Sequence, residues 1–399
     1  MLAALVEYQP VPSDLLPNLQ SFRLASEEYL SFEDLPLLQR LLGPLMLVVH
    51  IFDDVPVTSG SLLGSLLWSI SQASPHIREI SIRSPFIPVN VLALGGLLLS
   101  LSELKSIKVM DMPVPPRAVV DHLGTIDSLE CWDVLVFPAD PDLHSFTTRG
   151  DRFPNLRSFG FRAVDMVVAA KIVESMNCPF ERLEVTCRPR HQNATESVRA
   201  LRRMIDVLSR HHSLLSLSRL ALDVSSEILG DGESSAYVVL CPLFRLGAIK
   251  HVKLKLSIFH HIGDAWLEEA SQAWPCLETL QVTLPSWHKD WEQRHGPTMT
   301  LAGLIPLLKR CPRLGHLEVS LIAKPVDPSA LLGISSLTVY RVSFPFSAVE
   351  SPWEVYRSMA VMFPKIHFFD GFSYRWQGEN ETAWGNLGRW IGEMRKDGS

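Results

Sequence analysis

A short pattern of apolar and polar positions recurs along the chain. It consists of an apolar residue, two variable residues, an apolar residue, one variable residue and a third apolar residue. The last two apolar positions alternate with polar ones, as a strand with one buried face requires. The clearest copies are Ile77-Ile80-Ile82, Leu104-Ile107-Val109, Leu156-Phe159-Phe161, Leu277-Leu280-Val282 and Leu314-Leu317-Val319.

Eight further copies extend the pattern over most of the sequence. They begin at Leu19, Leu45, Ile126, Phe180, Leu217, Ile249, Ile334 and Ile366. Successive starts are 20 to 37 residues apart, with a mean of about 29, which lies at the long end of the leucine-rich-repeat range.

Upstream of many copies lies a stretch with helical spacing of apolar residues, for example 62–70, 167–173, 265–273 and 301–308. A proline often separates this stretch from the strand, and proline disfavours the helical conformation in the residue before it. Six prolines fit this role: Pro75, Pro154, Pro179, Pro275, Pro312 and Pro364. The predicted unit is therefore helix, turn and strand.

One such unit cannot bury its own apolar face, but stacked units can. We therefore predict an α/β fold, a leucine-rich-repeat solenoid (horseshoe) with a parallel sheet on the concave face and helices on the convex face. About thirteen irregular repeats should fill residues 1–370, and residues 371–399 should form a C-terminal cap and tail. A doubly wound α/β sheet is the alternative, but it rarely repeats one strand pattern so often, and the sequence shows no glycine-rich phosphate loop.

Composition and charge narrow the functional classes. Hydrophobic residues make up 47% of the chain and charged residues 20%, as in folded proteins. The 37 basic and 43 acidic residues give a net charge of −6, which does not favour nucleic acid or an anionic membrane as partner. The N-terminal residues lack a positively charged leader, and the most apolar run, 91–101, is too short to cross a bilayer. We expect a cytoplasmic or nuclear protein.

The reactive residue types show no catalytic or metal-binding spacing. The six cysteines contain no C-x-x-C pair, and Cys178, Cys276 and Cys311 each lie shortly before a strand start, where a small buried thiol packs well. The adjacent pairs His211-His212 and His260-His261 diverge on any regular element. Neither a nucleophile elbow nor a P-loop is present. We expect free thiols, no metal, no cofactor and no enzymatic activity.

Several repeat phrases resemble those of fungal F-box/leucine-rich-repeat proteins. They are ASPHIREISIR at 73–83, FPNLRSFGFR at 153–162, AWPCLETLQV at 273–282 and LAGLIPLLKRCPRLGHLEV at 301–319. In that family an N-terminal F-box docks onto the Skp adaptor of a cullin ubiquitin ligase, and the repeats hold the substrate. The resemblance therefore implies the substrate-recognition region of a ligase receptor, whether an incomplete version or a repeat-only relative.

The first repeat begins at about Leu15, so we expect no F-box within this chain. A Skp-type adaptor is then a partner only if an F-box exists outside the chain. A regulatory or inhibitor-like binder unrelated to ubiquitin is the alternative, and an enzyme is a third class.

The variable strand residues are the candidate binding surface. Their neighbours point into the core, so they should project from the concave face, where solenoids usually bind a protein substrate or partner. For any single residue, the simpler interpretation is the solvated side of a sheet. The set includes Arg219, Asp223, His251, Gln281 and His316, and our partner-binding candidates are Arg83, Lys108, Trp132, Arg162, Lys253 and Lys255.

Overall fold

The structure is a computed structural model that describes residues 18–26, 34–53, 60–83, 88–113, 116–137, 153–163, 166–176, 178–187, 194–211, 215–224, 236–256, 262–283, 298–345, 347–370 and 379–397. It divides into two compact units. Unit 1 comprises Met1–Val164 and Ser175–Phe180, and unit 2 comprises Asp165–Glu174 and Glu181–Ser399. Each unit is described by itself below.

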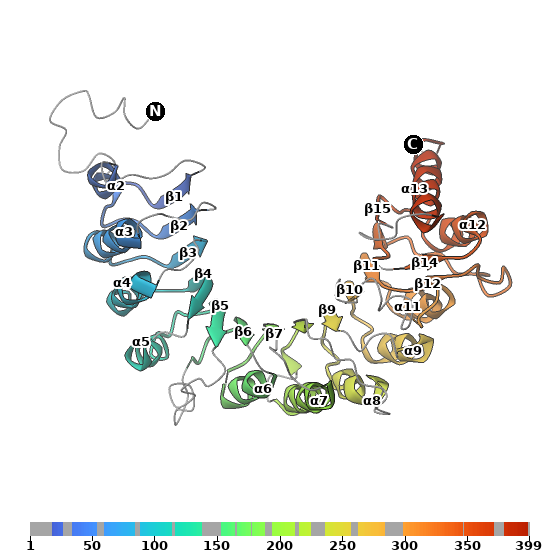
Figure 1. Cartoon of the computed structure of the whole chain (residues 1–399), viewed down its shortest axis with the longest axis horizontal. Helices are drawn as coiled ribbons and strands as arrows, with labels where there is room; N and C mark the ends of the chain where they lie inside the picture. The colour runs from blue at the N-terminus through green and yellow to red at the C-terminus, as the bar shows by residue number, and fades with distance from the viewer. Residues whose placement is uncertain are drawn as a thin grey trace. The chain divides into compact units, whose positions relative to one another are not determined.

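Unit 1 alternates strands and helices (Figure 1). Its strands, which pair in chain order and in parallel, are β1 (Ser21–Ser26), β2 (Val48–Asp53), β3 (Glu79–Arg83), β4 (Ser106–Pro113), β5 (Cys131–Phe137) and β6 (Ser158–Ala163). The helices between them are α2 (Leu35–Leu41), α3 (Gly60–Ala73), α4 (Pro88–Ser100) and α5 (Arg117–Leu123).

Unit 2 continues the same alternation. The strands of its main sheet are β7 (Arg182–Cys187), β8 (Arg219–Val224), β9 (His251–Leu256), β10 (Thr279–Thr283), β11 (His316–Val319), β13 (Arg341–Ser343) and β15 (Phe368–Asp370). Two short strands, β12 (Ile322–Ala323) and β14 (Ala348–Val349), pair separately. The helices are α6 (Met166–Ser175), α7 (Ala194–Arg210), α8 (Ala236–Leu240), α9 (Asp264–Ala273), α11 (Ile305–Arg310), α12 (Pro352–Met362) and α13 (Glu379–Asp397).

The strands of unit 2 pair without stagger, whereas in unit 1 the register shifts within the β4–β5 and β5–β6 pairs. In unit 2 Arg182 pairs with Arg219, and the first residues of the following strands continue the same row. In β1 to β4 and β6 to β11 the second and fourth residues are buried in the core, as Leu280 and Val282 of β10 are. This arrangement confirms the prediction of an α/β leucine-rich-repeat solenoid.

The backbone at the entry to each strand fixes this register. The carbonyl oxygen of Ser218, just before β8, accepts hydrogen bonds from the amides of both Lys250 and His251, at 2.8 and 2.9 Å. The carbonyl of Lys250 in turn accepts from Glu278 and Thr279, at 2.7 and 3.0 Å. One shared acceptor per repeat holds both residues at the entry, so a slip by one residue would break two bonds at every interface between repeats.

Helices lie on one side of the strands in both units (Figure 1). Four of the predicted prolines, Pro75, Pro275, Pro312 and Pro364, lie in the turn between a helix and the next strand, as expected. Among the described residues, we find no helix that combines the length and the apolar character required to span a membrane.

Ten of the predicted strand starts are confirmed, because a strand begins two residues after each of them. The other three were wrong in register. Leu45 is 48% exposed while Met46 is buried, so the second copy begins at Met46. The copies predicted at Ile126 and Ile334 begin instead at Leu129 and Val339. With these corrections the intervals between strand starts run from 24 to 37 residues, and the array is more regular than the sequence indicated.

Each of these errors has a physical cause. Leu337 is 61% exposed and lies in the turn before β13, although it fits the pattern. Ile126 is itself buried, in the turn before β5. The sequence therefore offers two apolar residues, Ile126 and Leu129, for the first position of the repeat pattern. The pattern shows where apolar residues occur, but it does not show which of them occupies the first core position of a repeat.

The last described helix covers the end of the core in unit 2. Trp384, Leu387 and Ile391 of α13 are buried, and the Trp384 ring lies 5.9 Å from those of both Phe344 and Phe369. The indole Nε1 of Trp384 also donates to the Ser347 carbonyl at 2.8 Å. Helix α13 therefore packs on the final repeats, while the predicted division at residue 370 stays a prediction.

Two adjacent residues of β9 test whether only one face of the strand is buried. Leu254 is fully buried and Lys253 is exposed. Leu254→Ala should lower the free energy of unfolding by about 2–5 kcal/mol, because a buried leucine leaves a cavity. Lys253→Ala should change it by less than about 0.5 kcal/mol. Urea denaturation measures both, and equal effects would contradict the assigned alternation.

Candidate functional site

The side chains at the first, third and fifth strand positions project from the side of each sheet opposite the helices. We call this side the open face. Its members on β8 to β10 lie in three rows across the strands, because the register has no stagger: Arg219, His251 and Thr279; Ala221, Lys253 and Gln281; and Asp223, Lys255 and Thr283.

Four of the six candidate residues occupy open-face positions with described side chains. Lys253 is exposed and has no ion pair among the described residues. Lys255 lies 3.5 Å from the Asp223 carboxylate, and Lys108 lies 4.0 Å from that of Glu79. Arg162 is half-buried at the fifth position of β6. Of these four side chains, Lys253 is therefore the one most available to contact a partner.

Two candidates need separate treatment. Trp132 was predicted to face a partner, and this is wrong: its side chain is 0% exposed and occupies the second position of β5, a core position. The register error at Ile126 caused this misassignment. Arg83 belongs to β3, but its side chain lies outside the described residues.

Sequence reasoning placed Arg219 and Asp223 on this face but missed how the side chains pair. The signal was available: Asp223 and Lys255 each follow their motif starts, Leu217 and Ile249, by the same distance. Equal offsets become lateral neighbours when strands stack without stagger. Of the two candidates Lys253 and Lys255, only Lys253 therefore remains without an ion pair among the described residues, and Arg219 is a second such cation.

Two imidazoles occupy first positions on the open face of unit 2. Burial, followed by the nearby Arg219 charge, lowers the pKa of His251, while Glu278 opposes the shift. Burial and the Arg341 charge lower the pKa of His316. The Nε2 atom of His316 is buried without a hydrogen bond among the described residues, 3.9 Å from the Glu318 carboxylate. Both rings therefore favour the neutral form near pH 7.

On the open face of unit 1, β5 and β6 carry the short side chains of Cys131, Asp133 and Ser158, and Gly160. The Asp133 carboxylate is buried between Cys131, whose thiol lies 3.6 Å away, and Ser158, whose hydroxyl lies 3.5 Å away. A Cβ atom at Gly160 would come within 2.8 Å of the Asp133 carboxylate, so a larger residue there would force the Asp133 side chain to shift. Burial, then the Asp133 charge, raises the pKa of Cys131, so this thiol is no activated nucleophile.

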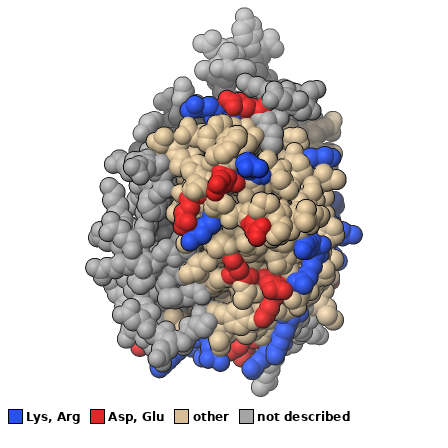
Figure 2. Space-filling model, turned by 90° about the vertical axis from the view of Figure 1, so that its right-hand side faces the viewer, with Lys and Arg blue, Asp and Glu red and all other residues tan. Residues whose placement is uncertain are grey.

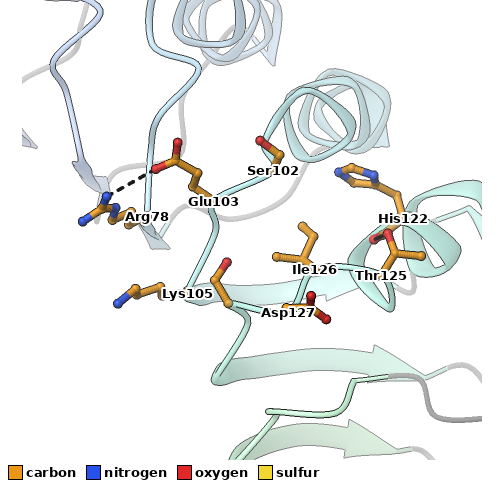
Figure 3. Close-up of a pocket in the computed structure, with 9 residues that line it drawn as sticks. Arg78, Ser102, Glu103, Lys105, His122, Thr125, Ile126 and Asp127 are labelled. Atoms are coloured by element: carbon orange, nitrogen blue, oxygen red, sulfur yellow. Dashed lines mark hydrogen bonds and ion pairs between the residues drawn. The ribbon is translucent and has the colours of Figure 1, made fainter.

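A depression of about 510 Å³ lies at the turns that precede β4 and β5 (Figure 3). Arg78 reaches the Glu103 carboxylate at 3.3 Å, and His76 contacts it at 2.8 Å. The His76 hydrogen bond, with that of Arg78, lowers the pKa of Glu103. Lys105 and Asp127 also line the depression. Charges of both signs thus balance locally, and the depression offers shape rather than a charged binding site.

Metal-binding groups and thiols contribute little to the candidate site. The part of the chain that the structure describes contains no group of three His, Cys, Asp or Glu side chains able to hold a metal ion. Cys178, Cys187 and Cys311 are buried, whereas Cys131, Cys241 and Cys276 are half-buried. The expected burial before strand starts therefore holds for Cys178 and Cys311 but not fully for Cys276.

The side of the molecule on which α11 and α12 lie differs from the open face of β8 to β10. In Figure 2, acidic and basic side chains are interspersed there among other residues. Mixed charge of this kind is typical of a solvated surface.

Comparisons with known proteins bear on the fold. No protein-family model and no curated protein matches this chain. A chain in the crystal structure of the Rad7 and Elc1 complex in yeast is similar over 86% of this chain and 80% of its own length, with a TM-score of 0.52 and 13% identity. At this identity the likeness concerns the fold alone, and it agrees with the repeat architecture.

The neutral imidazoles predict a pH dependence of stability. The ordinary histidine pKa is 6.5, and the folded state lowers it for His251 and His316, so below about pH 6.5 the unfolded chain binds more protons. The free energy of unfolding should therefore fall as the pH drops from about 7.5 to 5.5. His316→Gln should reduce this slope, by at most about 1.4 kcal/mol per pH unit. Urea denaturation at each pH measures it, with Thr279→Ser as control, and an unchanged slope in His316→Gln would contradict the assignment.

Burial also predicts the order of thiol reactivity. Burial raises the pKa of Cys178, and it raises that of Cys311 to about 11, so neither supplies thiolate near neutral pH. With a thiol reagent on the native protein, Cys276→Ser should remove one fast-reacting group and Cys178→Ser none. Under denaturing, non-reducing conditions all six thiols of the wild type should react. Loss of a fast group in Cys178→Ser would show that this thiol is accessible.

Proposed function

We propose that this chain is a non-enzymatic protein-binding scaffold: the substrate-recognition region of an F-box-type ubiquitin ligase receptor, or a repeat-only relative of such receptors. The observation that carries the proposal is the open face, where varied polar and charged side chains project from a rigid, in-register sheet opposite the helices. Such a surface presents many side chains to a partner at fixed lateral spacing.

Two further observations support the ligase class. The repeat phrases of 73–83, 153–162, 273–282 and 301–319 resemble those of F-box/leucine-rich-repeat proteins. The similar yeast structure is itself a complex, of Rad7 with Elc1. By analogy, the protein partner of this chain binds the open face, and a Skp-type adaptor binds only through an F-box outside the chain. The protein then acts in the cytoplasm or nucleus.

A bulky neutral substitution tests the binding surface without altering charge. Ala221 lies in the middle row of the open face, between Glu184 and Lys253 on the neighbouring strands. Ala221→Trp should obstruct a partner and remove its proteins, with any adaptor and cullin subunits, from affinity purifications quantified by mass spectrometry. Ala265→Trp, at an exposed position of α9, is the matched control and should retain them.

The two variants also distinguish an effect on the binding surface from an effect on the stability of the fold. Both should keep the wild-type melting temperature within a few degrees, because both sites are at least partly exposed. If the same partners co-purify with Ala221→Trp and with Ala265→Trp, the open face of β8 to β10 is not the binding surface. If the partners include no ubiquitin-ligase subunit even with the full-length gene product, the ligase assignment fails and a regulatory binder remains.

A further inference from the structure

The open face of β8 to β10 has an excess of positive charge within a chain of net charge −6. Its nine positions hold three cations (Arg219, Lys253 and Lys255) and one carboxylate (Asp223). The remaining positions are Ala221, which is small, and His251, Thr279, Gln281 and Thr283, all of which can donate hydrogen bonds. We call these nine residues the β8–β10 patch.

The carboxylates in and around the patch already have partners. Asp223 lies 3.5 Å from Lys255, and Glu184 on β7 lies 3.0 Å from Arg182. On the other side, Glu318 of β11 accepts a hydrogen bond from Gln281 at 2.8 Å. Glu278, just before β10, lies 3.6 Å from the His251 ring. Asp223 and Glu184 are thus paired with a basic side chain, whereas Glu318 and Glu278 contact a neutral amide and an imidazole.

Arg219 and Lys253 are the two cations that remain. Both side chains are exposed, and neither forms an ion pair with any described residue. They lie diagonally, one strand and two residues apart, because Arg219 pairs with His251 and Ala221 pairs with Lys253. Strand geometry places their Cα atoms roughly 8 Å apart, and Ala221 beside them adds no side chain to obstruct an approaching segment.

This spacing suits carboxylates on an extended peptide. Residues i and i+2 of an extended chain point to the same side and lie roughly 7 Å apart. A single phosphate would require the Arg219 and Lys253 side chains to converge on one point, whereas two alternate carboxylates match the spacing of their Cα atoms. Beside the cations, the Gln281 side chain, whose Nε2 donates to Glu318, still offers its carbonyl oxygen to the backbone amide of such a peptide.

We propose that the β8–β10 patch binds an acidic, extended segment of the protein partner, with Arg219 and Lys253 each contacting one of two carboxylates at alternate positions. This inference rests on the proposed function and specifies the chemistry of the partner. Charge complementarity of this kind accelerates association and excludes partners that carry positive charge at the same place.

The test uses the full chain and a synthetic probe. The probe is a fluorescein-labelled peptide of about ten residues in which Glu alternates with Ser, so that an extended conformation places every Glu on one side. Fluorescence anisotropy gives its Kd for the wild type, for the double variant R219E/K253E and for the control R199E/R202E. The control reverses two exposed arginines of α7 and changes the formal charge equally.

We expect R219E/K253E to weaken binding about tenfold or more and to remove most of its salt dependence, and R199E/R202E to bind like the wild type. A probe with Gln in place of Glu should bind the wild type weakly. Equal Kd values for R219E/K253E and R199E/R202E would overturn the inference. So would a wild type that binds the Glu and Gln probes alike, or that binds a single-phosphoserine peptide without Glu more tightly than the Glu probe.

The outcome is separable from that of the proposed function. If Ala221→Trp loses the cellular partner while R219E/K253E retains it, the open face binds a partner that is not acidic, and only this inference fails. If both variants retain the partner, the proposed binding surface fails as well. Circular dichroism melting of R219E/K253E confirms that it is folded, as expected for two exposed positions.

Discussion

Strands β2 to β6, β8 to β11, β13 and β15 each begin on a carbonyl oxygen that the preceding repeat provides. That oxygen accepts two amide hydrogen bonds, as the Ser218 carbonyl does from Lys250 and His251. The bonds leave no freedom to slide, and slippage by one residue would turn every core side chain outwards. The buried rows, such as Leu220, Val252 and Leu280, follow from this constraint because equivalent residues must lie side by side.

The same constraint explains why the intervals between strands can vary while the sheet does not. Strand starts differ by 24 to 37 residues, yet the first residues of neighbouring strands stay paired. The extra residues lie between the end of one strand and the beginning of the next, where helices, turns and linkers differ in length. Loop length adds little free energy once the two ends of a loop are fixed.

The sequence predicted the fold because leucine, isoleucine and valine at the pattern positions report directly on burial. It failed where an apolar residue in a turn imitated the pattern, as Leu45, Ile126 and Leu337 did, and the error at Ile126 also assigned Trp132 to the wrong face. For the open face, the sequence predicted which residues project from the sheet, but not which charged residues form ion pairs with one another. Pairing between Lys255 and Asp223 depends on lateral neighbours 32 residues away in the chain, which become visible only when the register is known.

Helix α13 has a consequence beyond the packing of its own repeats. A parallel sheet built from identical entry bonds has no internal reason to stop, since the last strand presents the same acceptors and apolar edge as any other. The Trp384 side chain closes that edge over Phe344 and Phe369. Without this closure, the apolar end of the last repeats would be exposed, and an exposed apolar strand edge favours pairing with another chain. Trp384 therefore limits the apolar surface that the last repeats would otherwise expose.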